Sequence, residues 1–255
     1  MDRDIRTQAQ KFLEAQGLSF NLGHKVSQVT RENNHITVTI ESFKEGKKSL
    51  VTCDKLLVAA GRKPYTADLN LEKLGVALDE RGYIQVDRSY KTSVPGIYAI
   101  GDVIPGPMLA HKGEEEGIAV AQIIAGKWGH VNYKTIPSVM YTHPEVAGVG
   151  LTEDLLQEQG RSYRVGKFPF LANSRAKGIG ETTGFVKILV DQDNDEILGA
   201  HIIGPDAGTL IQEIVLAMEY KGSAEDIALT CHAHPGLSEA VKEAALEAHG
   251  CSIHI

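Results

Sequence analysis

The chain has 255 residues, of which 42% are hydrophobic and 23% are charged, and its formal net charge is −7 at pH 7. This length predicts one large domain or two to three small ones, and the composition excludes wholesale disorder, a collagen-like fibre and a disulfide-dense scaffold. No apolar run approaches the roughly 18 residues that a membrane span needs, and an acidic chain without a basic block is a poor candidate for binding nucleic acid or anionic lipid. The three cysteines form no C-x-x-C pair, which fits a reducing compartment.

The first quarter of the chain predicts one helix and a small set of strands. Ile5, Ala9 and Phe12 recur at helical spacing and Gly17 supplies a stop, so we expect a helix over residues 4–16. Strands are expected over residues 18–21, 25–30, 35–41, 49–53 and 55–60, with a hairpin turn at residues 45–47. The pattern indicates a βαβ-type end followed by a small meander.

The middle of the chain is rich in loops. Gly61-Arg62-Lys63-Pro64 breaks the strand pattern. After it a loop-rich stretch reaches residues 83–86, and we then expect a buried strand over residues 96–100 that ends in Gly101-Asp102. A largely buried helix is expected over residues 112–125.

From Tyr133 onward, strands alternate with helices across short turns. Strands are expected over residues 138–141, 147–149, 163–168, 184–190 and 196–203. Helices are expected over residues 152–158, 207–221, 224–229 and 236–249. This order predicts an antiparallel sheet with helices on one side.

Short motifs for metal and dinucleotide binding are incomplete. Residues 191–195 have the acidic spacing of a calcium loop, but Glu196 stands where glycine is needed and Ile202 where glutamate is needed. The pairs Gly148-x-Gly150 and Gly178-x-Gly180 lack the third glycine of a dinucleotide loop. We therefore expect no metal site and no complete cofactor loop within the chain.

The segment around Asp102 carries the first candidate binding group. A strand that ends in Gly101-Asp102 places a carboxylate at the carboxyl end of a sheet, where it can accept hydrogen bonds from the hydroxyls of a ribityl or ribose chain. Residues 108–111 then lead into a helix whose N-terminus suits partial negative charge on a ring carbonyl. A carboxylate that only caps the local turn explains the residues alone equally well.

The segment around His234 carries a candidate acid–base group. Pro235 disfavours helical conformation at His234, so His234 is expected in a loop, with Glu239 in the first turn of the next helix. A carboxylate on one imidazole nitrogen fixes the tautomer and leaves the other nitrogen free to take a proton, which suits a thiol substrate. The alternative is a capping histidine beside a glutamate that the helix dipole favours, and the residues alone favour this alternative.

Five separated segments resemble motifs of one known family. T-S-V-P-G-I-Y-A-I-G-D at residues 92–102, with M-L-A-H after it, resembles the second flavin-binding motif of the FAD-dependent pyridine nucleotide–disulfide oxidoreductases. L-L-V-A-A-G-R-K-P at residues 56–64 resembles the link between that family's nicotinamide and central domains. Y-T-H-P-E at residues 141–145, F-P-F-x-A-N-S-R-A at residues 168–176 and C-H-A-H-P-G-L-S-E at residues 231–239 resemble its dihydrolipoyl dehydrogenase branch.

The resemblance implies a fold class of α/β plus α+β. Residues 1–62 would be the carboxyl-terminal remnant of a Rossmann-like NAD-binding domain, and residues 63–132 a central domain with the second FAD motif. Residues 133–255 would be an α+β dimerisation (interface) domain with an antiparallel sheet. The resemblance also implies two cofactors, FAD and NAD, both expected to be lost from this chain alone.

The resemblance also assigns roles to individual residues. His234 would deprotonate a dithiol substrate and Glu239 would orient it, acting across a homodimer interface formed by residues 133–255. Asp102 would hold the flavin ribityl chain. The residues expected to line the isoalloxazine are Met108, Leu109, Ala110 and His111, and those expected to border the nicotinamide are Gly61 and Val26.

Three parts that the family's reaction needs have no counterpart in this sequence: the glycine-rich FAD loop, the C-x-x-x-x-C redox disulfide and the glycine-rich NAD loop. We therefore expect the chain to be the carboxyl-terminal half of a dihydrolipoyl dehydrogenase, inactive by itself. Two alternatives remain: a non-catalytic dimerisation module, and another branch such as glutathione, trypanothione or mercuric reductase.

The expected partners are the lipoyl domains of 2-oxo acid dehydrogenase or glycine cleavage complexes, with neither nucleic acid nor membrane. The expected location is a bacterial cytoplasm or, alternatively, a mitochondrial matrix.

Overall fold

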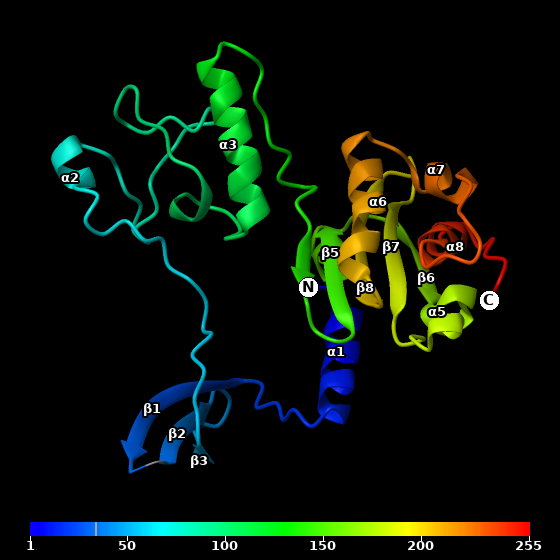
Figure 1. The fold of residues 1–255 in the computed structure, drawn as a ribbon, viewed down its shortest axis with the longest axis horizontal. Coiled ribbons are helices and arrows are strands. Elements are labelled where there is room, and N and C mark those ends of the chain that lie inside the picture. Colours follow the sequence, from blue (N-terminus) through cyan, green and yellow to red (C-terminus); the bar gives the residue numbers. More distant parts are fainter. Residues whose placement is uncertain (34) are drawn as a thin grey trace. The chain divides into compact units, whose positions relative to one another are not determined.

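The computed structural model describes residues 1–33 and 35–255, which form two compact units (Figure 1). The five-stranded unit comprises Met1–Ser19 and Asn132–Ile255, and the three-stranded unit comprises Phe20–Val131. The first helix is therefore grouped with the C-terminal sheet, although the three-stranded unit separates them in sequence. The division into domains at residues 1–62, 63–132 and 133–255 stays a prediction.

The three-stranded unit contains a small antiparallel sheet in the order β1-β2-β3. Its strands are β1 (His24–Glu32), β2 (His35–Ser42) and β3 (Lys48–Cys53). The predicted turn at residues 45–47 joins β2 to β3, and Gly46 adopts a φ of +64° there while its amide donates to the Ser42 carbonyl oxygen at 2.9 Å. The helical elements that follow are α2 (Leu71–Leu74), the 3-10 turn η1 (Gly101–Val103) and α3 (Ala110–Ile124).

Three strands expected in the first half of the chain are absent from the described residues. The segments 18–21 and 55–60 are irregular, and 96–100 forms only the single bridge Lys91–Tyr98. A strand needs a neighbouring strand to pair its backbone N–H and C=O groups, and apolar sequence alone does not supply one. Leu57 and Val58 are accordingly 87% and 78% exposed.

The five-stranded unit is built on one antiparallel sheet in the order β4-β5-β8-β7-β6, which confirms the predicted antiparallel sheet and its α+β class. Its strands are β4 (Ser138–Met140), β5 (Glu145–Gly150), β6 (Tyr163–Pro169), β7 (Phe185–Asp191) and β8 (Ile197–Gly204). Every residue of the central strands β7 and β8 is buried. These strands read as continuous runs rich in β-branched residues because both of their faces are covered.

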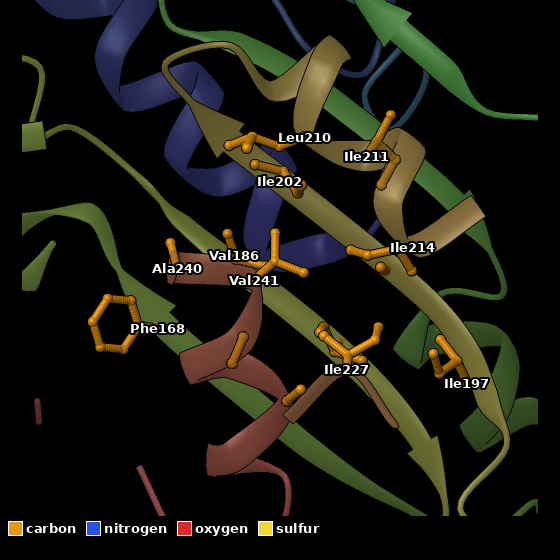
Figure 2. Packing of buried hydrophobic residues seen from close by; sticks show 14 of the residues in the cluster. Phe168, Val186, Ile197, Ile202, Leu210, Ile211, Ile214, Ile227, Ala240 and Val241 are labelled. Carbon is orange, nitrogen blue, oxygen red and sulfur yellow. The ribbon is translucent and has the colours of Figure 1, made fainter. Parts of the chain in front are cut away.

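One face of this sheet carries the main hydrophobic core. Side chains such as Val186 and Ile202 pack there against Ile211 and Ile214 of α6 and Val241 of α8 (Figure 2). The helices are α6 (Ala207–Glu219), α7 (Ala224–Leu229) and α8 (Glu239–Glu247), preceded along the chain by α4 (Glu153–Glu158) and α5 (Ser174–Ile179). The sequence did not predict α5, which Asn173 caps by accepting from the Ala176 amide at 2.9 Å.

The opposite face of the sheet is covered in part by α1 (Arg3–Ala15), so the expectation of helices on one side only was wrong. Successive strand residues point to opposite faces, and Ile203, next to Ile202 of the main core, packs against Ile5 of α1. The buried Lys187 on β7 anchors the start of α1 through its Nζ, which lies 3.0 Å from Asp2 Oδ1. A buried ammonium needs such carboxylate partners.

Candidate functional site

His234 and Glu239 form a hydrogen-bonded pair at the start of α8. His234 lies in the loop before the helix, as Pro235 predicts, and Glu239 is the first helical residue. The two oxygens of Glu239 lie 2.9 and 3.1 Å from His234 Nδ1. The amide of Gly236 donates to Glu239 Oε2 at 2.8 Å, so the carboxylate also holds the turn between the two residues.

The Glu239 carboxylate is held in its ionised form. Burial alone would raise its pKa, but the hydrogen bonds from the Gly236 amide and from His234 outweigh burial and leave the pKa below its ordinary value. An ionised carboxylate on Nδ1 fixes a proton there and so sets the tautomer of the imidazole. The His234 side chain is 64% exposed, and Nε2 makes no hydrogen bond to the described part of the chain, so Nε2 can take a proton from a group that approaches from solvent.

Asn173 supports the loop of this pair from a distant part of the sequence. Its side chain is buried, and its Nδ2 donates to the Gly236 carbonyl oxygen at 2.9 Å. Since Gly236 also binds Glu239, α5 and α8 are tied together at the turn that presents His234. Sequence reasoning assigned Asn173 no role, although it lies within the quoted segment 168–176. The residues that line a shallow hollow beside the pair are Phe168, Ala172, Asn173, Ser174, Glu243 and His254.

In the three-stranded unit, Arg62 brings two predicted segments together. Its Nη1 donates to Asp102 Oδ2 at 3.3 Å and to the Met108 carbonyl oxygen at 3.2 Å. The loop after β3 therefore meets the Gly101-Asp102 turn, and the Asp102 side chain remains 45% exposed. Sequence reasoning singled out the Gly61 loop and Asp102 separately, but it did not predict the arginine that joins them.

A buried ion pair fixes the backbone beneath Asp102. Lys112 Nζ lies 3.1 Å from Glu116 on the next turn of α3, and neither side chain is exposed. Lys112 donates to the Gly101 carbonyl oxygen at 2.9 Å, while the Gly101 amide donates to Glu116 at 2.7 Å. A Cβ on Gly113 would lie 3.3 Å from the Gly101 Cα, so glycine there lets the helix approach the turn closely.

The end of α3 near Asp102 suits an electron-rich ligand. The helix begins at Ala110, and Leu109 at the N-cap provides no side-chain hydrogen bond to the first turn. The N-terminal end of a helix attracts partial negative charge, and the nearby Asp102 carboxylate can accept hydrogen bonds from hydroxyl groups. These residues fit the carbonyl edge of a flavin ring and its ribityl chain.

Gly61 and Val26 stay predicted neighbours of a nicotinamide. Gly61 adopts a φ of +92° in the loop after β3, and Val26 lies beside the irregularity between Val26 and Gln28 in β1. The predicted site residues thus fall into two groups, with His234 and Glu239 in the five-stranded unit and the others in the three-stranded unit.

No group of three or more His, Cys, Asp or Glu side chains in residues 1–33 and 35–255 could hold a metal ion. No helix within these ranges is long and apolar enough to cross a membrane.

The fold and the site define a two-part protein: an antiparallel α+β unit with a His–Glu pair, and a second unit with a Gly-Asp turn before an uncapped helix. The family model described as pyridine nucleotide-disulphide oxidoreductase matches residues 1–117, and that family's dimerisation-domain model matches residues 136–245. The chain belongs to the pyridine nucleotide-disulphide oxidoreductase family.

Among curated relatives, the chain is 54% identical over all of its 255 residues to mitochondrial dihydrolipoyl dehydrogenase 1 of Arabidopsis thaliana, covering 50% of that protein. It is 52% identical to the human mitochondrial dihydrolipoyl dehydrogenase, over 97% of this chain and 49% of that protein. It is also 53% identical to leghemoglobin reductase of Glycine max, over 96% of this chain and 47% of that protein. The chain spans about half the length of the curated relatives that it matches.

Solved structures also superpose on this chain over nearly its whole length. LpdA from Mycobacterium tuberculosis superposes with a TM-score of 0.86 at 28% identity, over 96% of this chain and 53% of that chain. The Cu(II) complex of the HOCl-induced flavoprotein disulfide reductase RclA from Escherichia coli superposes with a TM-score of 0.87 at 27% identity, over 96% of this chain and 54% of that chain. Both comparisons extend over nearly the whole chain, so they support the architecture of each unit.

Proposed function

We propose that the chain is the carboxyl-terminal half of a dihydrolipoyl dehydrogenase, a flavoprotein that oxidises protein-bound dihydrolipoamide to lipoamide with NAD as acceptor. The observation that carries this proposal is the pairing of His234 Nδ1 with Glu239 at 2.9 Å while Nε2 remains available for a proton. The identity of 54% to the Arabidopsis enzyme over the whole chain supports the same activity.

The chemistry assigned to this chain is a proton transfer. Oxidation of a dithiol to a disulfide releases two electrons and two protons, and the thiolate is the form that reacts. His234 Nε2 accepts a proton from the substrate thiol, and the ionised Glu239 on Nδ1 stabilises the imidazolium that results. In the resting state a neutral imidazole faces the ionised Glu239, and the two become an ion pair when the proton arrives, which lowers the cost of forming the thiolate.

The family's cofactors fit residues of the three-stranded unit. Asp102 would bind the ribityl hydroxyls of FAD, residues 108–111 would line its ring, and Gly61 with Val26 would border NAD. When bound, FAD supplies a two-electron acceptor and NAD⁺ a hydride acceptor. Since the sequence contains neither of the family's glycine-rich dinucleotide loops nor a C-x-x-x-x-C pair, the chain by itself is expected to be colourless and inactive.

The proposed assembly is a homodimer formed through residues 133–255, and the match of residues 136–245 to a dimerisation domain supports it. The proposed partners are lipoyl domains of 2-oxo acid dehydrogenase or glycine cleavage complexes. For location, the mitochondrial names of the Arabidopsis and human relatives favour the mitochondrial matrix over a bacterial cytoplasm.

A fusion protein tests the proposed activity. The half of Arabidopsis dihydrolipoyl dehydrogenase 1 that the chain does not match is joined ahead of Met1, and NAD reduction by dihydrolipoamide is measured. We expect a yellow, active protein in which His234→Gln lowers kcat by about 100-fold or more, because general base catalysis contributes on that order. His35→Gln, an exposed histidine on β2, is the matched control and should leave kcat unchanged.

Three results would each contradict a part of the proposal. A yellow fusion protein that reduces NAD at the same rate with and without the His234 imidazole would remove the role of the base. A purified 255-residue chain that runs as a monomer in sedimentation analysis would remove the proposed dimer. A chain that is yellow by itself would overturn the expectation that both cofactors are lost.

A further inference from the structure

A second histidine in the same loop, His232, has a buried side chain whose two ring nitrogens both have hydrogen-bond partners. Only 6% of its side chain is exposed, in contrast to 64% for His234 two residues later. Its Nδ1 lies 2.9 Å from the carbonyl oxygen of Thr230, and its Nε2 lies 2.5 Å from Glu213 Oε1 on α6. Both ring nitrogens are therefore occupied, so His232 has no nitrogen left for a substrate proton.

The partners of His232 indicate its protonation state. A backbone carbonyl oxygen only accepts hydrogen bonds, and an ionised carboxylate only accepts them, so each ring nitrogen facing such a group has to donate. An imidazole that donates from both nitrogens is an imidazolium. Glu213 is the counter-ion, and the short Nε2–Oε1 distance is typical of a charge-assisted hydrogen bond.

The same contacts connect the loop to three helices. Thr230 ends α7, and its carbonyl oxygen also accepts from Lys242 Nζ of α8 at 2.7 Å. Glu213 belongs to α6. His232 thus ties α6 to the end of α7, and Lys242 ties that end to the helix whose first residue is Glu239. His232 and Lys242 thus both contact the carbonyl oxygen of Thr230. These two contacts hold the start of the loop that carries His234.

We propose that His232, held as an imidazolium by Glu213, is a positioning residue that fixes the loop carrying His234 against Glu239. This inference rests on the proposed function, since His234 is worth positioning only if it is the base. His232 itself takes no part in the proton transfer. Its charge gives this non-helical loop a buried electrostatic anchor.

The protonation state is tested on the 255-residue chain by ¹⁵N NMR of the histidine rings at pH 7.5. The resonances of His232 are assigned by their disappearance in His232→Gln. We expect both ring nitrogens of His232 to show protonated shifts and to lose them in Glu213→Gln. A neutral ring with one unprotonated nitrogen in the unmodified chain would overturn the proposal.

The positioning role is tested by hydrogen exchange at the Gly236 amide, which donates to Glu239 and so reports the geometry of the pair. Loss of a charged hydrogen bond costs about 1.5–3 kcal/mol, so Glu213→Gln and His232→Gln should accelerate Gly236 exchange about 10- to 100-fold. His232→Asn retains a donor near the Nδ1 position and should have the smaller effect of the two histidine substitutions. The matched control is His143→Gln, an exposed histidine 3.6 Å from Glu181 in the same unit.

Exchange at Ile188, in the centre of β7, reports whether the unit remains folded. Unchanged Gly236 exchange in Glu213→Gln and His232→Gln, with Ile188 still protected, would contradict the proposal. If His232→Gln unfolds the unit, Glu213→Gln carries the test because its amide keeps the shape of the carboxylate. A failed His234 prediction in the fusion protein would remove the proposed function but leave these NMR results unaffected, so the two failures are distinguishable.

Discussion

The two antiparallel sheets of this chain differ in what covers them. Every residue of β7 and β8 is buried, whereas every residue of β1 after His24 is exposed. Both sheets contain β-branched and aliphatic residues, and apolar side chains of the three-stranded unit such as Val29 and Leu50 are 46% and 69% exposed. Similar strand sequences are therefore buried to very different extents, because burial depends on the helices that a unit contributes. The free energy of unfolding should respond to substitutions in the five-stranded unit far more than in the other.

Lys187→Ala should have the largest effect on stability. The Lys187 ammonium is 1% exposed and contacts Asp2, Asp4 and Glu153, so its removal leaves buried negative charge without a partner. Breaking such a pair costs about 3–5 kcal/mol. The measurement is the free energy of unfolding of the five-stranded unit in urea, with hydrogen exchange at the Ile188 amide as the probe of that unit. The counterpart is Lys25→Ala on β1, whose exposed ion pair with Glu41 should be worth about 1 kcal/mol or less. Equal losses for both lysines would refute the contrast.

Ile202→Ala should have the next largest effect. Ile202 of β8 is fully buried in the core beneath α6 (Figure 2). Its truncation to alanine therefore removes buried carbon atoms and leaves a cavity. Substitutions of this kind cost about 2–5 kcal/mol, and we expect about 3 kcal/mol in urea unfolding. A loss below about 1 kcal/mol would mean that the core relaxes into the space far more than close-packed interiors do.

Acid should weaken the attachment of α1 to the sheet. Burial alone would raise the pKa of Asp2, but the hydrogen bond from the Glu153 amide and the Lys187 ammonium outweigh it, so the pKa lies below the ordinary 3.8. For Asp4, the bonds from Lys167 and Lys187 likewise outweigh burial and lower its pKa. Because both pKa values are lower in the folded state, this stabilisation is fully present above the unfolded value of 3.8 and disappears as pH falls through the folded values.

The measurement is the free energy of unfolding of the five-stranded unit between pH 6 and pH 2, with Asp2→Asn as the comparison. The variant should start from a lower stability at pH 6 and lose less of it on acidification. A decline of the same steepness in both proteins would show that the acid sensitivity arises elsewhere.

Leu50→Thr on β3 should have the smallest effect. Its side chain is 69% exposed, so the substitution removes little buried apolar surface, and exposed substitutions of this kind usually change stability by less than about 0.5 kcal/mol. Threonine is β-branched and therefore suits a strand position. A loss above about 2 kcal/mol would indicate that the outer face of this sheet is covered, and it would abolish the contrast between the two units.

Much of the C-terminal sheet could be predicted because three of its strand pairs, β4–β5, β6–β7 and β7–β8, join strands that follow one another in the sequence. β7 and β8 form a hairpin around the polar turn near Asp193, and the apolar face of α6 follows directly. The strand predicted at residues 55–60 failed because periodicity reports an apolar face and not the neighbour that must pair with the backbone. The attachment of α1 to β8 was also unpredictable, since nothing local links Ile5 to Ile203.

The site shows the same division. The pairing of His234 with Glu239 could be predicted because Pro235 and the start of the helix fix a short-range geometry. The supports of that loop come from residues far along the chain, such as Asn173 and Glu213, and no spacing rule connects them with His234. Arg62 likewise reaches Asp102 across a loop whose path the sequence does not define.

The grouping of α1 with the five-stranded unit has a consequence for synthesis. On the ribosome, Ile5 and Phe12 emerge long before β8, the strand that carries their partner Ile203. The three-stranded unit, Phe20–Val131, is completed in the interval. The apolar side of the first helix must therefore wait, exposed to water or to a chaperone, until residue 203 has left the exit tunnel. Closing such a long-range contact is slow relative to local pairing, so α1 should be the last element of its unit to dock.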